Sequence, residues 1–249
     1  MNYPLSKTTR ALLLLTRKRL LAAMLMAASL LAASRSLAGG VPVELQATNA
    51  AGGTLARKAT GNGVTVAVCR RPYVWTSTDS ECWVERQTGN VCLLHDLAFG
   101  NGLFVAVGNE GTLVTSRDGV AWTLRESRTD ERLRGIAFGN GRFVAVGYAG
   151  TIITSKDGVR WTTRSSGIEE RLQAVAFDHG TFVAVGGNGV ILASSNGKNW
   201  SRQASGVSVR LERIEHRDGL FIASDSAGTT VLVSADGRQW TAREAATTQ

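Results

Sequence analysis

Short apolar runs separated by glycine-containing turns follow one another along the chain from about residue 53. One stretch shows the pattern clearly: the runs 133–138, 143–147 and 151–155 are followed by a fourth that starts near Trp161. The breaks between them fall at 139–141, 148–150 and 157–158. Runs rich in Val, Ile, Phe and Thr, bounded by such turn residues, indicate β-strands rather than helices. The pattern therefore predicts four short strands in about 40 residues.

This unit is repeated. The seven residues Ser-Arg-Asp-Gly-Val-Ala-Trp at 116–122 recur in related form at 155–161, 194–200 and 234–240, with a degenerate copy at 77–83. The tryptophans that end the five copies are 39, 39, 39 and 40 residues apart. Repetition of a four-stranded unit at this period is typical of β-propeller blades. We therefore expect an all-β propeller of about five four-stranded blades over 53–249, preceded by a linker or an extra strand of the last blade at 39–52.

The recurring motif has a structural interpretation. Asp-Gly or Asn-Gly at the centre of a two-residue hairpin suits a type I′ turn, and Ser and Asp oxygens accept backbone N–H groups in turns. The tryptophan then covers apolar area beside the next blade. The motif residues are Ser77, Asp79, Trp83, Ser116, Asp118, Gly119, Trp122, Ser155, Asp157, Gly158, Trp161, Ser194, Asn196, Gly197, Trp200, Ser234, Asp236, Gly237 and Trp240.

On these residues the chain resembles the Asp-box (BNR) repeat propellers. Their usual motif is Ser-x-Asp-x-Gly-x-Thr-Trp, whereas here the glycine follows the aspartate directly and the motif is one residue shorter. The shorter form is similar to the motifs of BNR-like secreted propellers and of the photosystem II assembly-factor family. The resemblance implies a propeller fold and a structural role for the motif. It does not fix the function, because sialidases, other glycosidases, sorting receptors and assembly factors share the motif.

The charge is uneven along the chain. Of the formal net charge of +8, residues 1–38 contribute six basic and no acidic side chains, so the remainder carries 22 basic and 20 acidic ones. The nearly balanced charge of residues 39–249 therefore does not indicate nucleic-acid binding. Residues 1–38 have the pattern of a signal peptide, with cleavage expected between Ala38 and Gly39. Its apolar run, 20–33, is shorter than the roughly 20 residues that span a bilayer. We expect an exported protein, periplasmic or extracellular, whose mature chain does not span a membrane; an uncleaved anchor is the alternative.

Strand direction places the loops on two rims. The turns between the second and third strands of each blade share a rim with the connections from one blade to the next. These loops vary most between copies, and variable loops on a rigid frame commonly carry binding sites. The candidate binding residues on this rim are Arg70, Arg71, Tyr73, Asn109, Glu110, Tyr148, Asn188 and Asp225.

Three arginines occupy one position of the repeat, directly before the leucine that opens each first strand: Arg132, Arg171 and Arg210. First strands line the channel of a propeller, so these side chains are candidates to converge at its mouth on a carboxylate, sulfate or phosphate. The alternative is a solvated rim in which Arg132 and Arg171 pair with Glu131 and Glu170.

Catalytic motifs are weak. The three histidines, His95, His179 and His216, fall at different positions of the repeat and have no metal-ligand spacing, and no cofactor motif is present. We therefore expect no metal, no cofactor and no catalytic residues, and favour a scaffold for a protein or glycan partner. The alternative is a sialidase-like glycoside hydrolase or a degenerate relative, with Glu110 and Asp225 as an example of a carboxylate pair. Export also makes a Cys69–Cys92 disulfide plausible.

Overall fold

The computed structural model describes residues 45–46 and 57–243. The predicted leader, 1–38, and most of the 39–52 segment lie outside the described residues. Among the described residues, no helix is long and apolar enough to cross a membrane.

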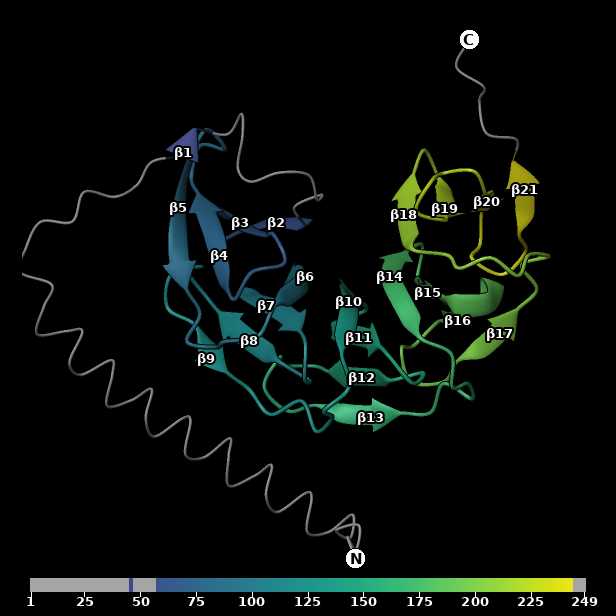
Figure 1. The fold of residues 1–249 in the computed structure, drawn as a ribbon, viewed down its shortest axis with the longest axis horizontal. Helices are drawn as coiled ribbons and strands as arrows, with labels where there is room; N and C mark the ends of the chain where they lie inside the picture. The colour runs from purple at the N-terminus through teal and green to yellow at the C-terminus, as the bar shows by residue number, and fades with distance from the viewer. Residues whose placement is uncertain (1–44, 47–56, 244–249) are drawn as a thin grey trace, which may run out of the picture. The chain divides into compact units, whose positions relative to one another are not determined.

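Five antiparallel sheets follow one another along the chain, each built from consecutive strands (Figure 1). The first contains β2 (Arg57–Gly61), β3 (Val64–Val68), β4 (Tyr73–Ser77) and β5 (Cys82–Gln87). The second contains β6 (Leu94–Gly100), β7 (Leu103–Gly108), β8 (Leu113–Ser116) and β9 (Thr123–Leu124). The third contains β10 (Leu133–Gly139), β11 (Arg142–Gly147), β12 (Ile152–Ser155) and β13 (Thr162–Arg164). The fourth contains β14 (Leu172–Asp178), β15 (Thr181–Gly186), β16 (Ile191–Ser194) and β17 (Ser201–Gln203), with a short 3₁₀ turn at Gly187–Gly189. The fifth contains β18 (Arg213–Arg217), β19 (Leu220–Ser224), β20 (Val231–Ser234) and β21 (Thr241–Arg243).

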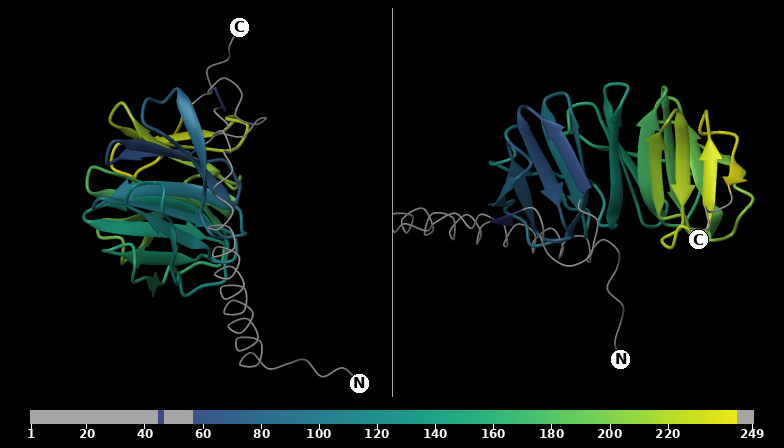
Figure 2. Two further views of the ribbon diagram at one scale, coloured as in Figure 1. Left: turned by 90° about the vertical axis from the view of Figure 1, so that its left-hand side faces the viewer. Right: turned by 90° about the horizontal axis from the view of Figure 1, so that it is seen from above.

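This is the architecture of a five-bladed β-propeller, which confirms the predicted fold class and places the strands of the third blade within a residue or so of the expected positions. The first strand of each sheet packs against the first strand of the next, so β2, β6, β10, β14 and β18 form the inner row (Figures 1 and 2).

A further short strand differs from the expectation. β1 (Leu45–Gln46) pairs with β5 of the first sheet, with Leu45 opposite Trp83. Residues 39–52 were expected to extend the last blade or to form a linker. The outer edge of the first sheet offers unpaired backbone groups, and a preceding segment satisfies them there.

The core lies between neighbouring sheets. Phe143 and Phe182 are fully buried in second strands, and β7 is buried along its whole length because a sheet covers each of its faces. In β19 of the last sheet, burial alternates instead: Phe221 and Ala223 are buried, whereas Leu220 and Ile222 are partly exposed. Among the described residues, a neighbouring sheet therefore covers only one face of β19.

The recurring motif closes a wider turn than the sequence suggested. Ser155 ends β12 and Thr162 begins β13, so six residues connect the strands instead of a two-residue type I′ hairpin. The Asp157 carboxylate accepts hydrogen bonds from the backbone N–H groups of Val159 and Arg160 at 2.9 and 2.8 Å, and Ser155 Oγ accepts one from Gly158. Side-chain oxygens thus satisfy the turn's donors, which a two-residue hairpin would satisfy through the backbone.

A glycine and a phenylalanine fit together at each of the first three interfaces between sheets. A Cβ placed on Gly100 would lie 2.1 Å from the ring of Phe138 in the next sheet, and Gly61 and Gly139 have the same relation to Phe99 and Phe177. Only glycine leaves room for these rings. The inner strands can therefore approach closely where this pair occurs.

Candidate functional site

The turns between second and third strands lie beside the connections between blades. In the third sheet, Tyr148 N donates to the carbonyl of Arg132 at 2.9 Å, and Gly150 N donates to Glu170 at 3.0 Å. The second and fourth sheets repeat these backbone bonds. We call this side of the propeller the loop rim. The two loop types occur together there, as the strand directions predicted.

Two guanidinium groups from successive blades lie over one aromatic ring on the loop rim. The Cζ atoms of Arg132 and Arg171 are each 5.1 Å from the ring centroid of Tyr148, within the range of cation–π contacts. Arg132 Nη1 also lies 3.4 Å from the Tyr148 hydroxyl. We call these three residues the arginine–tyrosine stack.

The third arginine of the column does not join the stack. Arg210 Nη2 lies 2.5 Å from the Glu212 carboxylate, which neutralises it. Of the three arginines, only Arg132 and Arg171 therefore come together, on the ring of Tyr148. The alternative expectation paired Arg171 with Glu170 in a solvated rim. Glu170 instead pairs with Arg202 at 3.6 Å, and the Arg171 guanidinium lies over the Tyr148 ring.

Bulges in the inner strands present a second row of polar side chains. The pairing register shifts between Leu94 and Asp96, between Leu133 and Gly135, and between Leu172 and Ala174. The extra residues are His95, Arg134 and Gln173, and a bulge commonly re-aims a side chain next to a binding site. Arg134 bridges the other two, with Nη1 3.4 Å from His95 Nδ1 and Nε donating to Gln173 at 3.2 Å.

Sequence reasoning missed this row. In four repeats the residue after the opening leucine is polar: His95, Arg134, Gln173 and Glu212. That recurring polarity was the available signal, but the residue type changes in every copy. A search for repeated residue types therefore passes over it.

Several positive charges act on the residues of this row. Burial lowers the pKa of His95 to about 4, and the nearby charges of Arg134, Arg70 and Arg132 lower it further, although a 2.6 Å contact with Asn109 Oδ1 acts in the opposite direction. Burial also lowers the pKa of Arg134, with Arg70 as the next cause. Several guanidinium groups thus lie close enough to influence one another, an arrangement suited to an anionic ligand.

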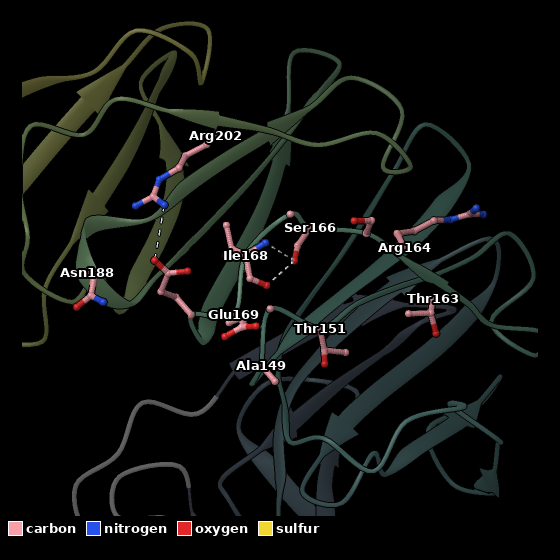
Figure 3. A pocket seen from close by; sticks show the side chains of 13 residues that line it. Ala149, Thr151, Thr163, Arg164, Ser166, Ile168, Glu169, Asn188 and Arg202 are labelled. Carbon is pink, nitrogen blue, oxygen red and sulfur yellow. Dashed lines mark hydrogen bonds and ion pairs between the residues drawn. The ribbon is translucent and has the colours of Figure 1, made fainter.

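An open depression of about 960 Å³ lies on the loop rim (Figure 3). It is formed between the third and fourth blades, and its lining includes Ala149, Thr151, Ser166, Glu169, Asn188 and Arg202. Ala149 directly follows Tyr148, so one turn contributes both to the stack and to the depression.

The remaining candidates on the rim have different surroundings. Asn109 contacts His95, and Asn188 lines the depression. Asp225 accepts hydrogen bonds from the Thr229 hydroxyl and from Thr229 N and Thr230 N, which hold its own loop and lower its pKa.

Four other candidates lie in or near the turns of the first and second sheets. Tyr73 packs edge-on against Trp75 at 5.9 Å, and the Arg71 carbonyl accepts a hydrogen bond from Leu94. Arg70 and Glu110 both have a φ of 53°, a left-handed turn conformation. None of these residues is brought into the arginine–tyrosine stack.

The predicted disulfide is not formed. Cys69 and Cys92 both carry free thiols and are partly buried, and burial raises the pKa of the Cys69 thiol. The structure therefore gives no support to the predicted Cys69–Cys92 pairing.

Two of the histidines, in contrast, lie together on the opposite rim. His179 follows β14 and His216 lies in β18, and one ligating atom from each, with one from Asp178, falls within 4.8 Å of the others. In the sequence, the histidines were compared only for whether they share one repeat position. Different positions of successive blades that lie side by side were not compared, so the meeting of His179 and His216 was not predicted.

Known proteins resemble this chain in fold. No family model matches the sequence, and no curated protein is similar to it. A structure of YCF48 bound to D1 peptide superposes with a TM-score of 0.56 at 19% identity, covering 75% of this chain and 65% of that one. The chain thus spans about two thirds of the length of that protein. A streptogramin B lyase structure gives a TM-score of 0.70 at 10% identity over 83% of this chain and 74% of the lyase. YCF48 from Cyanidioschyzon merolae gives 0.53 at 14% identity over 75% and 70%.

Proposed function

We propose that this chain is an exported, non-catalytic propeller scaffold that binds a carboxylate-bearing segment of a protein partner on its loop rim. The observation that carries the proposal is the arginine–tyrosine stack. It holds two guanidinium groups from different blades against one ring, and Arg132 and Arg171 make no ion pair with any described residue.

An anionic ligand suits this geometry. A guanidinium presents paired N–H donors that match a carboxylate, and stacking on an aromatic ring limits the freedom lost on binding. Arg134 on the neighbouring bulge adds positive charge. Burial has already removed part of the water around the Arg134 guanidinium. The attraction between this charge and a bound carboxylate is therefore stronger than it would be in water.

A peptide segment is favoured over a glycan. Among the tyrosines of the predicted mature chain, Tyr73 packs on Trp75 and Tyr148 carries arginines on its ring, whereas sugars commonly stack on a free aromatic face. The polar depression on the loop rim has room for further side chains of an extended segment. The fold relationship to YCF48, whose structure holds a D1 peptide, supports the same choice.

The hydrolase alternative has less support from the candidate residues. Of the example pair Glu110 and Asp225, the second has both carboxylate oxygens engaged within its own loop. We therefore assign no catalytic role.

The test is a fluorescence-anisotropy titration with a labelled peptide that contains several glutamates, and with the same peptide in which glutamine replaces them. We expect the acidic peptide to bind more tightly at low salt. The double variant Arg132→Gln/Arg171→Gln should lose this preference. The matched control is Arg210→Gln, which changes the same repeat position where the guanidinium already pairs with Glu212. Equal binding by the double variant and the wild type would refute the proposal.

A further inference from the structure

The interface between the fourth and fifth blades departs from the repeat at three neighbouring positions. The preceding interfaces place Gly139 at the end of the first strand, Asn140 after it, and Phe177 in the next blade. Here the equivalent residues are Asp178, His179 and His216. Each of the three replacements introduces a side chain that can ligate a metal ion.

His216 takes the position that a phenylalanine holds at the other interfaces, somewhat farther from its aromatic neighbour. The ring of His216 lies 5.2 Å from that of Phe221, and the phenylalanines at the equivalent positions lie 4.5–4.7 Å from theirs. Asp178 stands where glycine otherwise admits the ring. The strand pairing is the same as in the repeat: Asp178 pairs with Thr181 as Gly139 does with Arg142, and His216 pairs with Phe221 as Phe177 does with Phe182.

The three side chains face one another. Nδ1 of His216 lies 2.6 Å from Asp178 Oδ2, and Nδ1 of His179 lies 3.1 Å from Asp178 Oδ1. The imidazole rings are 4.9 Å apart. Ligand atoms of a tetrahedral zinc site are separated by about 3.3 Å, given bonds of about 2.0–2.1 Å. Small side-chain rotations therefore bring all three donors onto one ion.

The hydrogen bonds among the three residues do not satisfy His216. Its Nε2 is buried without a hydrogen-bond partner, whereas the phenylalanine of the other interfaces has no such requirement. A partly satisfied buried polar group destabilises a fold. Stability alone therefore does not explain the histidine at this position.

We propose that Asp178, His179 and His216 form a binding site for a divalent transition-metal ion of the zinc type. Two imidazoles and one carboxylate suit zinc, whereas magnesium prefers oxygen ligands. The exposed fraction rises from 15% for the side chain of His216 to 63% for that of His179, so the site opens to solvent and leaves a coordination position for water or another ligand. This rim is opposite the arginine–tyrosine stack, so the metal site is independent of the proposed function.

The test is a calorimetric titration of the untagged chain with Zn²⁺, and with Mg²⁺ as the comparison ion. We expect one Zn²⁺ per chain and no binding of Mg²⁺ at the same concentration. The triple variant Asp178→Gly/His179→Asn/His216→Phe restores the residues of the other interfaces and should fold while losing Zn²⁺ binding.

Two single variants complete the experiment. His179→Asn changes a solvent-exposed side chain and should weaken Zn²⁺ binding by roughly tenfold or more. His95→Asn alters the histidine of the other rim and should leave the affinity unchanged. The proposal is overturned if the wild type does not bind Zn²⁺, if the triple variant or His179→Asn binds as tightly as the wild type, or if only His95→Asn loses the ion.

Discussion

Oδ2 of Asp96 in the second blade accepts a hydrogen bond from the backbone N–H of Ile136 in the third blade, at 3.0 Å. The same carboxylate accepts one from Leu97 N at 3.0 Å, and Arg57 lies 3.9 Å away. Burial nevertheless raises the pKa of Asp96 to about 6. The preceding residue, His95, has a pKa lowered to about 4.

These neighbours predict opposite responses to pH. Between about pH 6.5 and 4, the unfolded chain protonates His95 while the folded chain does not, so this term lowers stability as the pH falls. Between about pH 6 and 4, the folded chain protonates Asp96 first, so that term raises stability as the pH falls. The charges facing the pair, Arg57, Arg70, Arg132 and Arg134, stay constant over this range.

The two terms can be separated by single variants. Compared with the wild type, His95→Asn should lose less stability on acidification from about pH 6.5 to about pH 4.5, and Asp96→Asn should lose more. Urea unfolding at the two pH values measures the change for each protein. Variants that both follow the wild-type dependence would show that neither group titrates as assigned.

Trp161 should be the most important tryptophan of the recurring motif for stability. It is 2% exposed, packs 6.4 Å from the ring of Phe143 and donates from Nε1 to the Gly158 carbonyl at 3.0 Å. Trp161→Ala should therefore cost about 3–5 kcal/mol in the free energy of unfolding. Trp240→Ala, at a partly exposed equivalent in the last blade, is the control and should cost less. A loss below about 1 kcal/mol for Trp161 would contradict its role in the core.

The fourth copy of the motif predicts how the acidic residue can be replaced. Asn196 accepts hydrogen bonds from Lys198 N and Asn199 N at 2.8 and 3.0 Å, as Asp157 does from its own turn. Asp157→Asn should therefore be mild, whereas Asp157→Ala removes the oxygen that accepts both bonds and should cost about 1–3 kcal/mol. Thermal unfolding of the two variants tests the difference. Equal losses would show that the turn does not depend on these bonds.

Tyr148 is predicted to act through its ring. Tyr148→Phe keeps the aromatic face under both guanidinium groups and should bind the acidic peptide nearly as well as the wild type. Tyr148→Leu removes the face and should weaken binding by about 1 kcal/mol or more, although both arginines remain. The same anisotropy titration measures both variants. Wild-type affinity in Tyr148→Leu would mean that the stack does not position the arginines.

The repeat made the fold predictable. A fixed period of turns and apolar runs determined the number of blades and the strand limits of the third, because each blade must cover its neighbours with the same face. The pairing of Leu45–Gln46 with β5 was outside this logic, since a free sheet edge can accept a segment from either end of the chain.

The candidate sites were only partly predictable. Arg132, Arg171 and Arg210 share one repeat position, but Arg210 forms an ion pair with Glu212 and stays out of the stack. The residue equivalent to Glu212 differs between copies, so the repeat does not predict this ion pair. The bulges that place His95 and Arg134 beside each other have no repeated residue type that marks them in the sequence. Asp178 and His216, however, have the same 38-residue separation as Gly139 and Phe177, so their proximity could have been read from the repeat.

The most direct test of the binding account is the affinity of the glutamate-containing peptide for Arg132→Gln/Arg171→Gln compared with Arg210→Gln. The account predicts that the double variant binds the acidic and the glutamine peptides equally weakly, while Arg210→Gln retains the wild-type preference for the acidic one. A double variant that keeps the preference, or an Arg210→Gln variant that loses it to the same extent, would contradict the account.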